Sequence, residues 1–222
     1  MKTLKALSLR EQAGQVIRAG IIAGELEPGE IYSATVLADR LGVSPTPVRE
    51  AMLDLANAGL VEAVRNRGFR VLTPDERDLD EIGELRLMVE VPATRLVVER
   101  ASDEELAALE RAVVDLESTA EEADLAGFLL ADREFHIGLL ELTGNRRLVR
   151  LVDQLRDQTR LIGLKGLAES RRLTESAREH REVLEALQAR DADRVEELMR
   201  VHIVHTRGIW AGRDEAGRPA VT

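Results

Sequence analysis

The chain has 222 residues, of which 44% are hydrophobic and 32% charged, a composition typical of a globular protein with one large domain or two small ones. It contains no run of about 18 apolar residues, so we expect no membrane-spanning segment. Residues 1–20 lack the apolar core and cleavage site of a signal peptide. The absence of cysteine excludes disulfides and thiolate metal sites and suits a cytoplasmic protein.

The net charge of −10 is unevenly distributed along the chain. Residues 1–74 contain 9 basic and 8 acidic side chains, whereas residues 75–222 contain 22 and 33. The acidity, which would repel nucleic acid, therefore belongs almost wholly to the second part. We expect two domains, a small and nearly neutral one over residues 1–74 and an acidic one over residues 75–222.

The first domain has the sequence pattern of a winged helix-turn-helix. Capping serines, glycines and apolar spacing predict three helices, over residues 8–23, 34–40 and 44–58. Two short strands around a polar turn should follow, at residues 60–64 and 69–72. Helix, short helix, turn, helix and hairpin is the order of elements in this DNA-binding fold.

The helix that begins at Ser44 is expected to lie in the major groove of DNA, with its N-terminal residues toward the bases. Arg49 could bind a guanine or a phosphate. The hydroxyls of Ser44 and Thr46, with the amides of the helix N-terminus, suit phosphate oxygens. Arg65 and Arg67 on the hairpin turn would reach the flanking backbone or the minor groove.

A purely structural role is the alternative for these residues. Arg49 could be a solvated side chain paired with Glu50 or Asp54, and Ser44 could be only a helix cap. Each residue judged singly favours that alternative. The order of the elements, with basic residues at both contact points of the motif, favours DNA binding.

The second domain shows only helical patterns. Leu, Ala, Val, Glu and Arg recur at helical spacing, and helices are expected near residues 75–100, 103–122, 125–142, 145–164, 172–189 and 191–210. Pro92 should kink the first of them. The predicted fold class is therefore mainly α, a winged helix-turn-helix followed by an all-α helical bundle.

All four histidines lie in this second domain. Asp132 and His136 are four residues apart on one predicted helix and so share a face, while His180 and His202 lie on two later helices. Three imidazoles and one carboxylate from three helices could bind a divalent cation, with open positions for an effector carboxylate. Spacing alone favours ordinary surface or capping roles for these side chains, and His205, one turn beyond His202, could also be the third imidazole.

The N-terminal motif resembles a known family at this point. Residues 42–52 (GVSPTPVREAM) resemble the recognition-helix signature of GntR-family transcription regulators, and residues 24–29, 58–61 and 67–71 also match that family's winged domain. The resemblance covers about residues 5–73. The candidate DNA-binding residues are Ser44, Thr46, Arg49, Arg65, Arg67 and Gly68. The family commonly has a base-reading Arg where this chain has Pro45, so the resemblance implies DNA binding without implying a particular operator sequence.

The rest of the chain is similar to the all-helical ligand-binding domain, of the FCD type, in the FadR subgroup of that family. The matching stretches are 85–90, 132–136, 144–145, 179–180 and 199–202. The similarity implies a divalent metal, such as Zn, Ni or Mn, held by Asp132, His136, His180 and His202. It also implies a small organic-acid or sugar-acid effector beside the metal, with Arg86 as its carboxylate partner. The alternative for Arg86 is a surface ion pair with Glu90.

These inferences together predict a homodimeric repressor that reads a palindromic operator in double-stranded DNA under the control of a small carboxylate. One alternative is a metal-dependent hydrolase or isomerase that uses the Asp/His cluster. Such an enzyme needs a general base beside the metal, and the one candidate, Glu134, lies roughly 200° around the helix from Asp132. Another alternative is a purely structural metal in a dimerisation domain.

Overall fold

The chain divides between Pro74 and Asp75 into two compact units. The computed structural model describes residues 7–159 and 172–210. Within these residues, no helix combines the length and the apolar character that crossing a bilayer requires.

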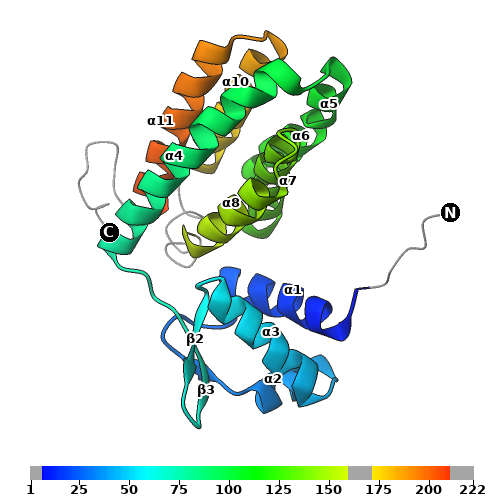
Figure 1. The fold of residues 1–222 in the computed structure, drawn as a ribbon, viewed down its shortest axis with the longest axis vertical. Helices are drawn as coiled ribbons and strands as arrows, with labels where there is room; N and C mark the ends of the chain where they lie inside the picture. The colour runs from blue at the N-terminus through cyan, green and yellow to red at the C-terminus, as the bar shows by residue number, and fades with distance from the viewer. Residues whose placement is uncertain (1–6, 160–171, 211–222) are drawn as a thin grey trace, which may run out of the picture. The chain divides into compact units, whose positions relative to one another are not determined.

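The first unit contains three helices (Figure 1), and buried apolar side chains form a small core between them. They are α1 (Leu9–Ile22), α2 (Ala34–Leu41) and α3 (Pro45–Asn57). The side chain of Ser8 caps α1 and that of Ser33 caps α2, each accepting a hydrogen bond from a backbone N–H three residues on. The core is made by Ile17, Ile21, Leu37, Val48, Met52 and Leu55.

A three-stranded antiparallel sheet completes this unit, in the order β1-β3-β2. The strands are β1 (Ile31–Tyr32), β2 (Val61–Val64) and β3 (Gly68–Val71). The predicted hairpin is present, and its strand ends lie within one residue of the expected positions. The sequence does not predict β1, because two residues are too few to show an alternating pattern.

The first residue of β3, Gly68, lies close against the backbone of β1. Gly68 has a φ of +131°, and a Cβ at this position would overlap the carbonyl oxygen of Tyr32. Only glycine fits such an approach without displacing the neighbouring strand. Gly68 therefore fixes where the turn that carries Arg65 and Arg67 emerges from the sheet.

The second unit is all-helical in the residues that the structure describes. Its helices are α4 (Glu76–Arg100), α5 (Asp103–Ala108), α6 (Glu110–Glu121), α7 (Leu125–Glu141), α8 (Arg146–Thr159), α10 (Arg172–Gln188) and α11 (Ala192–Trp210). The predicted helix over residues 103–122 is divided at Leu109, and the last part of the one predicted over 145–164 lies outside the described residues. α4 continues through Pro92, which lies on its exposed face. The mainly α fold class is confirmed.

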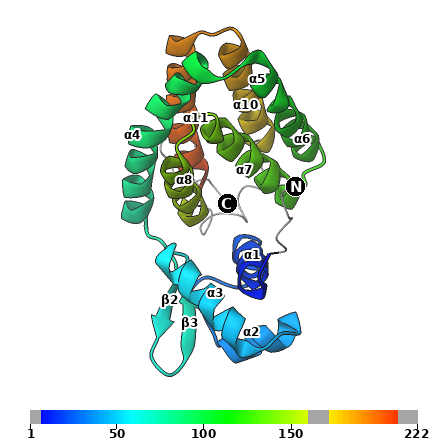
Figure 2. The ribbon, with the colours of Figure 1, turned by 45° about the vertical axis from the view of Figure 1, so that its right-hand side comes forward.

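Helices α4 and α11 lie side by side, as do α6 and α7, and α10 contacts both α11 and α6 (Figures 1 and 2). The core between these helices is mostly apolar. Its buried charged or titratable side chains are Arg86, Glu90, Asp132, His136, Arg156, Asp157, His180 and His202. Because buried charges are costly unless they are paired or bind a ligand, this group marks the candidate site.

Candidate metal centre and DNA-binding surface

The four predicted metal ligands come together inside the helical unit. Asp132 and His136 lie on α7, His180 on α10 and His202 on α11, and one ligand atom from each lies within 4.8 Å of the others. The Nε2 atom of His136 is 3.0 Å from that of His180 and 3.2 Å from that of His202. Asp132 Oδ1 is 3.3 Å from His180 Nε2.

These separations fit the ligands of a single ion. Two nitrogens that each lie about 2.1 Å from a metal, at about 90° to 100° to one another, are about 3.0 to 3.2 Å apart. The donor set of three imidazoles and one carboxylate also suits a borderline divalent cation. The residues present therefore fit a metal ion.

The outward ring nitrogens of two histidines have acceptors. His180 Nδ1 donates to the backbone oxygen of Ser176 at 2.7 Å, and His202 Nδ1 donates to Glu179 Oε2 at 2.8 Å. In the neutral rings these bonds place the Nε2 lone pairs toward the cluster. These two lone pairs converge on His136 Nε2, where either a proton on that nitrogen or a cation bound among the three nitrogens would offset their repulsion.

Burial keeps the histidines in the ligating form. Desolvation, with the nearby Arg156, holds the pKa of His136 well below its usual 6.5. Desolvation and the neighbouring His180 lower the pKa of His202 to about 4. Both rings are neutral at pH 7, as metal ligation requires.

Two buried arginines border the cluster. Arg156 Nη2 donates to Asp132 Oδ2 at 2.6 Å, so the other carboxylate oxygen of Asp132 faces the histidines. Arg86 Nε donates to Glu90 Oε1 at 2.6 Å, and Arg86 is only 2% exposed. The Arg86–Glu90 pair exists, but the surface location given by the alternative is wrong. Among the described residues, Arg86 Nη2 and Arg156 Nε have no hydrogen-bond acceptor.

Arg156 is not among the residues predicted from the sequence, although a signal for it exists. The buried face of α8 includes Val152, Leu155 and Thr159. Arg156 lies on that same face, four residues after Val152 and three before Thr159. An arginine within an inward-facing helical stripe indicates a buried charge, which needs a partner.

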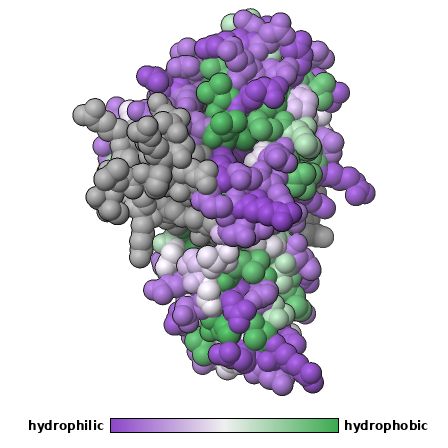
Figure 3. Space-filling view, turned by 90° about the vertical axis from the view of Figure 1, so that its left-hand side faces the viewer, coloured by the Kyte–Doolittle hydropathy of each residue, from purple (hydrophilic) through white to green (hydrophobic). Residues whose placement is uncertain are grey.

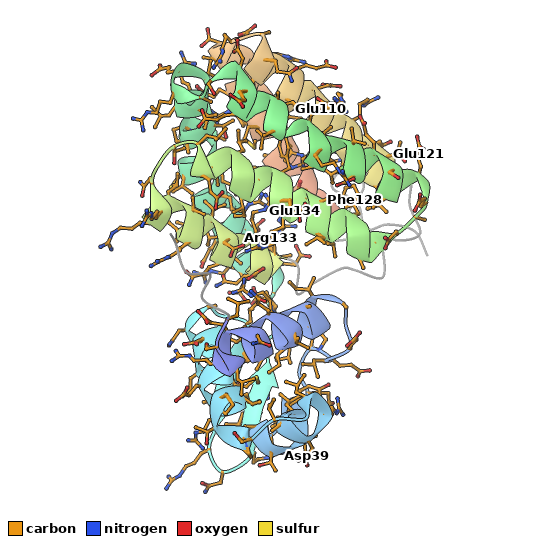
Figure 4. All side chains as sticks on the ribbon, turned by 90° about the vertical axis from the view of Figure 1, so that its right-hand side faces the viewer. Asp39, Glu110, Glu121, Phe128, Arg133 and Glu134 are labelled. Carbon is orange, nitrogen blue, oxygen red and sulfur yellow. The ribbon has the colours of Figure 1, made fainter. Side chains whose placement is uncertain are left out.

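Glu134 and His205, both considered on the sequence, lie outside the cluster. Glu134 (labelled on α7 in Figure 4) lines a surface hollow together with Asp115 and Ser118. His205 Nδ1 donates to Glu179 instead of joining the four converging side chains. The geometry therefore favours His202 over His205 as the third imidazole.

The N-terminal part of α3 lacks the contacts expected if Ser44 were a helix cap and Arg49 were paired with Glu50 or Asp54. In the described structure Ser44 occupies the capping position but its side chain makes no capping hydrogen bond. Asp54 is paired with Arg10 instead of Arg49, since Arg10 Nε donates to Asp54 Oδ2 at 2.6 Å. Arg49 forms no ion pair with any described residue, so its guanidinium is available to a ligand.

The hairpin turn presents two more arginines. Arg65 and Arg67 are exposed and form no ion pair within residues 7–159 and 172–210. Arg70, in contrast, is bonded to Glu62 across the β2–β3 ladder. A helix tip and a turn that both carry unpaired guanidinium groups can contact phosphates and base edges.

A winged helix-turn-helix followed by an all-helical domain with a buried histidine cluster defines a class of DNA-binding regulators. The model for bacterial regulatory proteins of the gntR family matches residues 9–71, and that for the FCD domain matches residues 81–205. The chain belongs to the GntR family, in the subgroup that carries an FCD domain.

Individual relatives agree with this assignment. The transcriptional regulator YdhC of Bacillus subtilis is 29% identical over 186 residues, which span 83% of each chain. McbR of Escherichia coli is 30% identical over 152 residues, 68% of this chain and 69% of that one. The solved structure of E. coli McbR superimposes with a TM-score of 0.84 at 27% identity, over 92% of this chain and 98% of the other.

The relatives and the families decide between the predicted functional classes. Both families are those of transcription regulators. The chain is a DNA-binding transcription regulator and not a metal-dependent hydrolase or isomerase.

Proposed function

We propose that this protein is a cytoplasmic repressor whose operator binding is controlled by a small carboxylate bound beside a divalent metal. The observation that carries the proposal is the convergence of Asp132, His136, His180 and His202 in one buried cluster. Zn, Ni and Mn are the candidate ions, because imidazole nitrogens suit Zn and Ni and the carboxylate oxygen also suits Mn. A relative that is 29% identical, GlaR of Escherichia coli, is a repressor by name, which supports repression.

The two buried arginines support an anionic effector. A buried N–H without an acceptor costs about 1 to 3 kcal/mol, and Arg86 Nη2 and Arg156 Nε both lack one among the described residues. A carboxylate bound next to the metal would supply acceptors to these groups and could also coordinate the ion. Arg86 and Arg156 would then orient the effector, and the metal would add charge that holds it.

The exposed face of α4 supports a homodimer. Leu85, Met88 and Leu96 are 47%, 67% and 39% exposed, and with exposed Pro92 they share one side of the helix at spacings of three, four and four residues. The side of the helical unit that Figure 3 faces shows apolar side chains gathered amid hydrophilic surface. An apolar stripe of this spacing fits a second copy of the same helix. Two paired chains would then present two α3 helices to the half-sites of a palindrome.

DNA binding through α3 is tested with fragments selected from random DNA by the wild-type protein. Arg49→Ala should weaken binding by about 5- to 150-fold, since one specific arginine contact is worth about 1 to 3 kcal/mol. Arg111→Ala is the matched control, because it removes the same charge from an exposed pair on α6. Unchanged affinity of the Arg49 variant in fluorescence anisotropy would refute the role of this helix tip.

Metal and effector control are tested on the same DNA with a panel of small organic and sugar acids. A member of the panel should release the wild-type protein from DNA when Mn²⁺ or Zn²⁺ is present, and chelation should abolish the release. His180→Ala should lower the metal content and remove the response, while binding to DNA survives. Normal metal stoichiometry in that variant counts against the site, and a response insensitive to chelation favours a structural metal.

A further inference from the structure

The carboxylate of Glu179 lies between two imidazoles of α11. Its Oε2 atom accepts a hydrogen bond from His202 Nδ1 at 2.8 Å, and its Oε1 atom accepts one from His205 Nδ1. Glu179 is on α10, directly before the cluster residue His180. The carboxylate thus bonds both imidazoles of α11, one inside the cluster and one outside it.

The bond from His202 decides which of its ring nitrogens faces the cluster. A carboxylate accepts but cannot donate, so Nδ1 carries the proton and Nε2 carries the lone pair. His202 Nε2 is the atom that lies 3.2 Å from His136 Nε2. Glu179 therefore selects the tautomer and fixes the direction of the ligand atom.

His205 restricts the rotation of this carboxylate. With Oε1 bonded to His205 and Oε2 to His202, rotation of the carboxylate would break both bonds. The side chain of Glu179 is 17% exposed and that of His205 is 21% exposed, so the arrangement lies at the edge of the buried cluster. Burial alone would raise the pKa of Glu179, but the two imidazole N–H groups outweigh it and hold the pKa at about 2.

We propose that Glu179 is a positioning residue of the metal centre, which aligns His202 for the ion, and that His205 anchors Glu179. The proposal rests on the metal binding proposed above. It gives a role to His205, the one histidine that is not part of the cluster. It also differs from a purely structural link between α10 and α11, which would stabilise the fold equally with and without metal.

Glu179→Gln separates these two roles. The amide keeps the size of the side chain, but its N–H₂ group can turn toward Nδ1 of His202 and favour the tautomer with a proton on Nε2. Affinity for Mn²⁺ or Zn²⁺ alone, measured by competition with a chelator, should fall about 10- to 100-fold. The melting temperature of the metal-free protein should change little, so the rise in melting temperature on adding metal should shrink.

Glu182→Gln is the matched control, because Glu182 lies one turn further along α10 and pairs at the surface with Arg178 and Arg194. It should bind metal as the wild type does.

A second pair of variants tests the anchoring residue, His205. His205→Leu should lower metal affinity less than Glu179→Gln does, and His205→Gln, whose amide can still donate to Glu179, should restore it.

The outcomes distinguish this inference from the proposed function. If the wild type binds no divalent ion, the proposed metal centre is wrong and the positioning role fails with it. If the wild type binds the ion and Glu179→Gln binds it equally well, only the positioning role is wrong. A metal-free protein destabilised by Glu179→Gln, with an unchanged metal-induced rise, would also overturn the role in favour of a structural link. If Glu179→Gln does not fold, equal metal affinities of the two His205 variants overturn it.

Discussion

Ser33 and Ser44 both precede a helix, but only the side chain of Ser33 caps it. The Oγ atom of Ser33 accepts a hydrogen bond from the backbone of Val36, so this residue stabilises α2. Ser44 occupies the equivalent position of α3 without such a bond. Pro45 and Pro47, which follow it, have no N–H to donate, and Thr46 has the one free amide of the first turn. The hydroxyl of Ser44 is thus available for a phosphate.

We predict that alanine variants of the two serines affect different properties, stability in one case and DNA binding in the other. Ser33→Ala should lower the free energy of unfolding by about 1 kcal/mol, because a cap is lost. Ser44→Ala should change the stability much less but weaken DNA binding, because a phosphate contact is lost. Urea unfolding and anisotropy on the same samples measure both. A Ser44 variant that is destabilised yet binds DNA normally would show that this serine is only a cap.

The depressed pKa of His202 predicts that the metal-free protein loses stability in acid. The folded-state pKa of about 4 lies below the unfolded value of 6.5, so between these values the unfolded chain binds more protons. The contribution of His202 to the free energy of unfolding is therefore fully present above about pH 6.5, and it is lost as the pH falls toward 4. Between about pH 7 and pH 5 the loss should be about 2 kcal/mol. His202→Gln should flatten the dependence in chelator-treated protein, and an equal slope in both proteins would contradict the assignment.

At the scale of elements, periodicity predicts most of the fold. Helix ends marked by caps are predicted well, since Ser33 and Gly42 bound α2 and a capping box begins α4. The division of the helix at Leu109 is not predictable, because neither glycine nor proline marks it. The strand β1 forms only because β3 offers it a partner, and such a tertiary effect leaves little trace in two residues.

The α4 stripe leads to a prediction about assembly. Met88→Glu places a charge at the centre of the exposed apolar face, so the dimer should dissociate and DNA affinity should fall, while the helical unit stays folded. Glu84→Gln, at an exposed position on the same helix, is the control and should leave the dimer intact. Sedimentation velocity measures the assembly state. A Met88 variant that remains dimeric would place the interface elsewhere.

At the scale of the whole molecule, α11 connects the metal centre to the start of α4. His202 is a cluster residue, and Arg207, five residues later, donates to Glu76 Oε2 at 2.9 Å and lies 2.6 Å from Asp80 Oδ1. α4 begins only five residues after β3 ends. A shift of α11 caused by the proposed effector would therefore reach the segment that precedes α4.

We predict that Arg207→Ala uncouples the two units. The variant should still bind metal and DNA, but the effector should change its DNA affinity less than the 5- to 150-fold typical of allosteric coupling. Arg95→Ala is the control, because Arg95 joins α4 to Asp193 and Glu196 of α11 at the other end of α4. Anisotropy titrations with and without effector measure the coupling. A full response in the Arg207 variant would rule out this route.

The candidate site was only partly predictable from the sequence. The i, i+4 spacing places Asp132 and His136 on one face, and similarity to a family adds His180 and His202. The contacts of Arg156 and Glu179 depend on how α8 and α10 pack against α7 and α11, which no spacing along one helix reveals. Helical spacing can therefore mark Arg156 as a buried charge, but the partners of the residues that orient ligands are identified only from the tertiary structure.

The close fit of Gly68 against Tyr32 limits how the specificity of this regulator can be redesigned. Position 68 must remain glycine, and position 66 favours glycine, asparagine or aspartate because Asn66 has a φ of +61°. A combinatorial library aimed at new target sequences should therefore vary residues 65 and 67, together with 45, 46 and 49 on the helix. Randomising positions 66 and 68 would yield mostly misfolded variants.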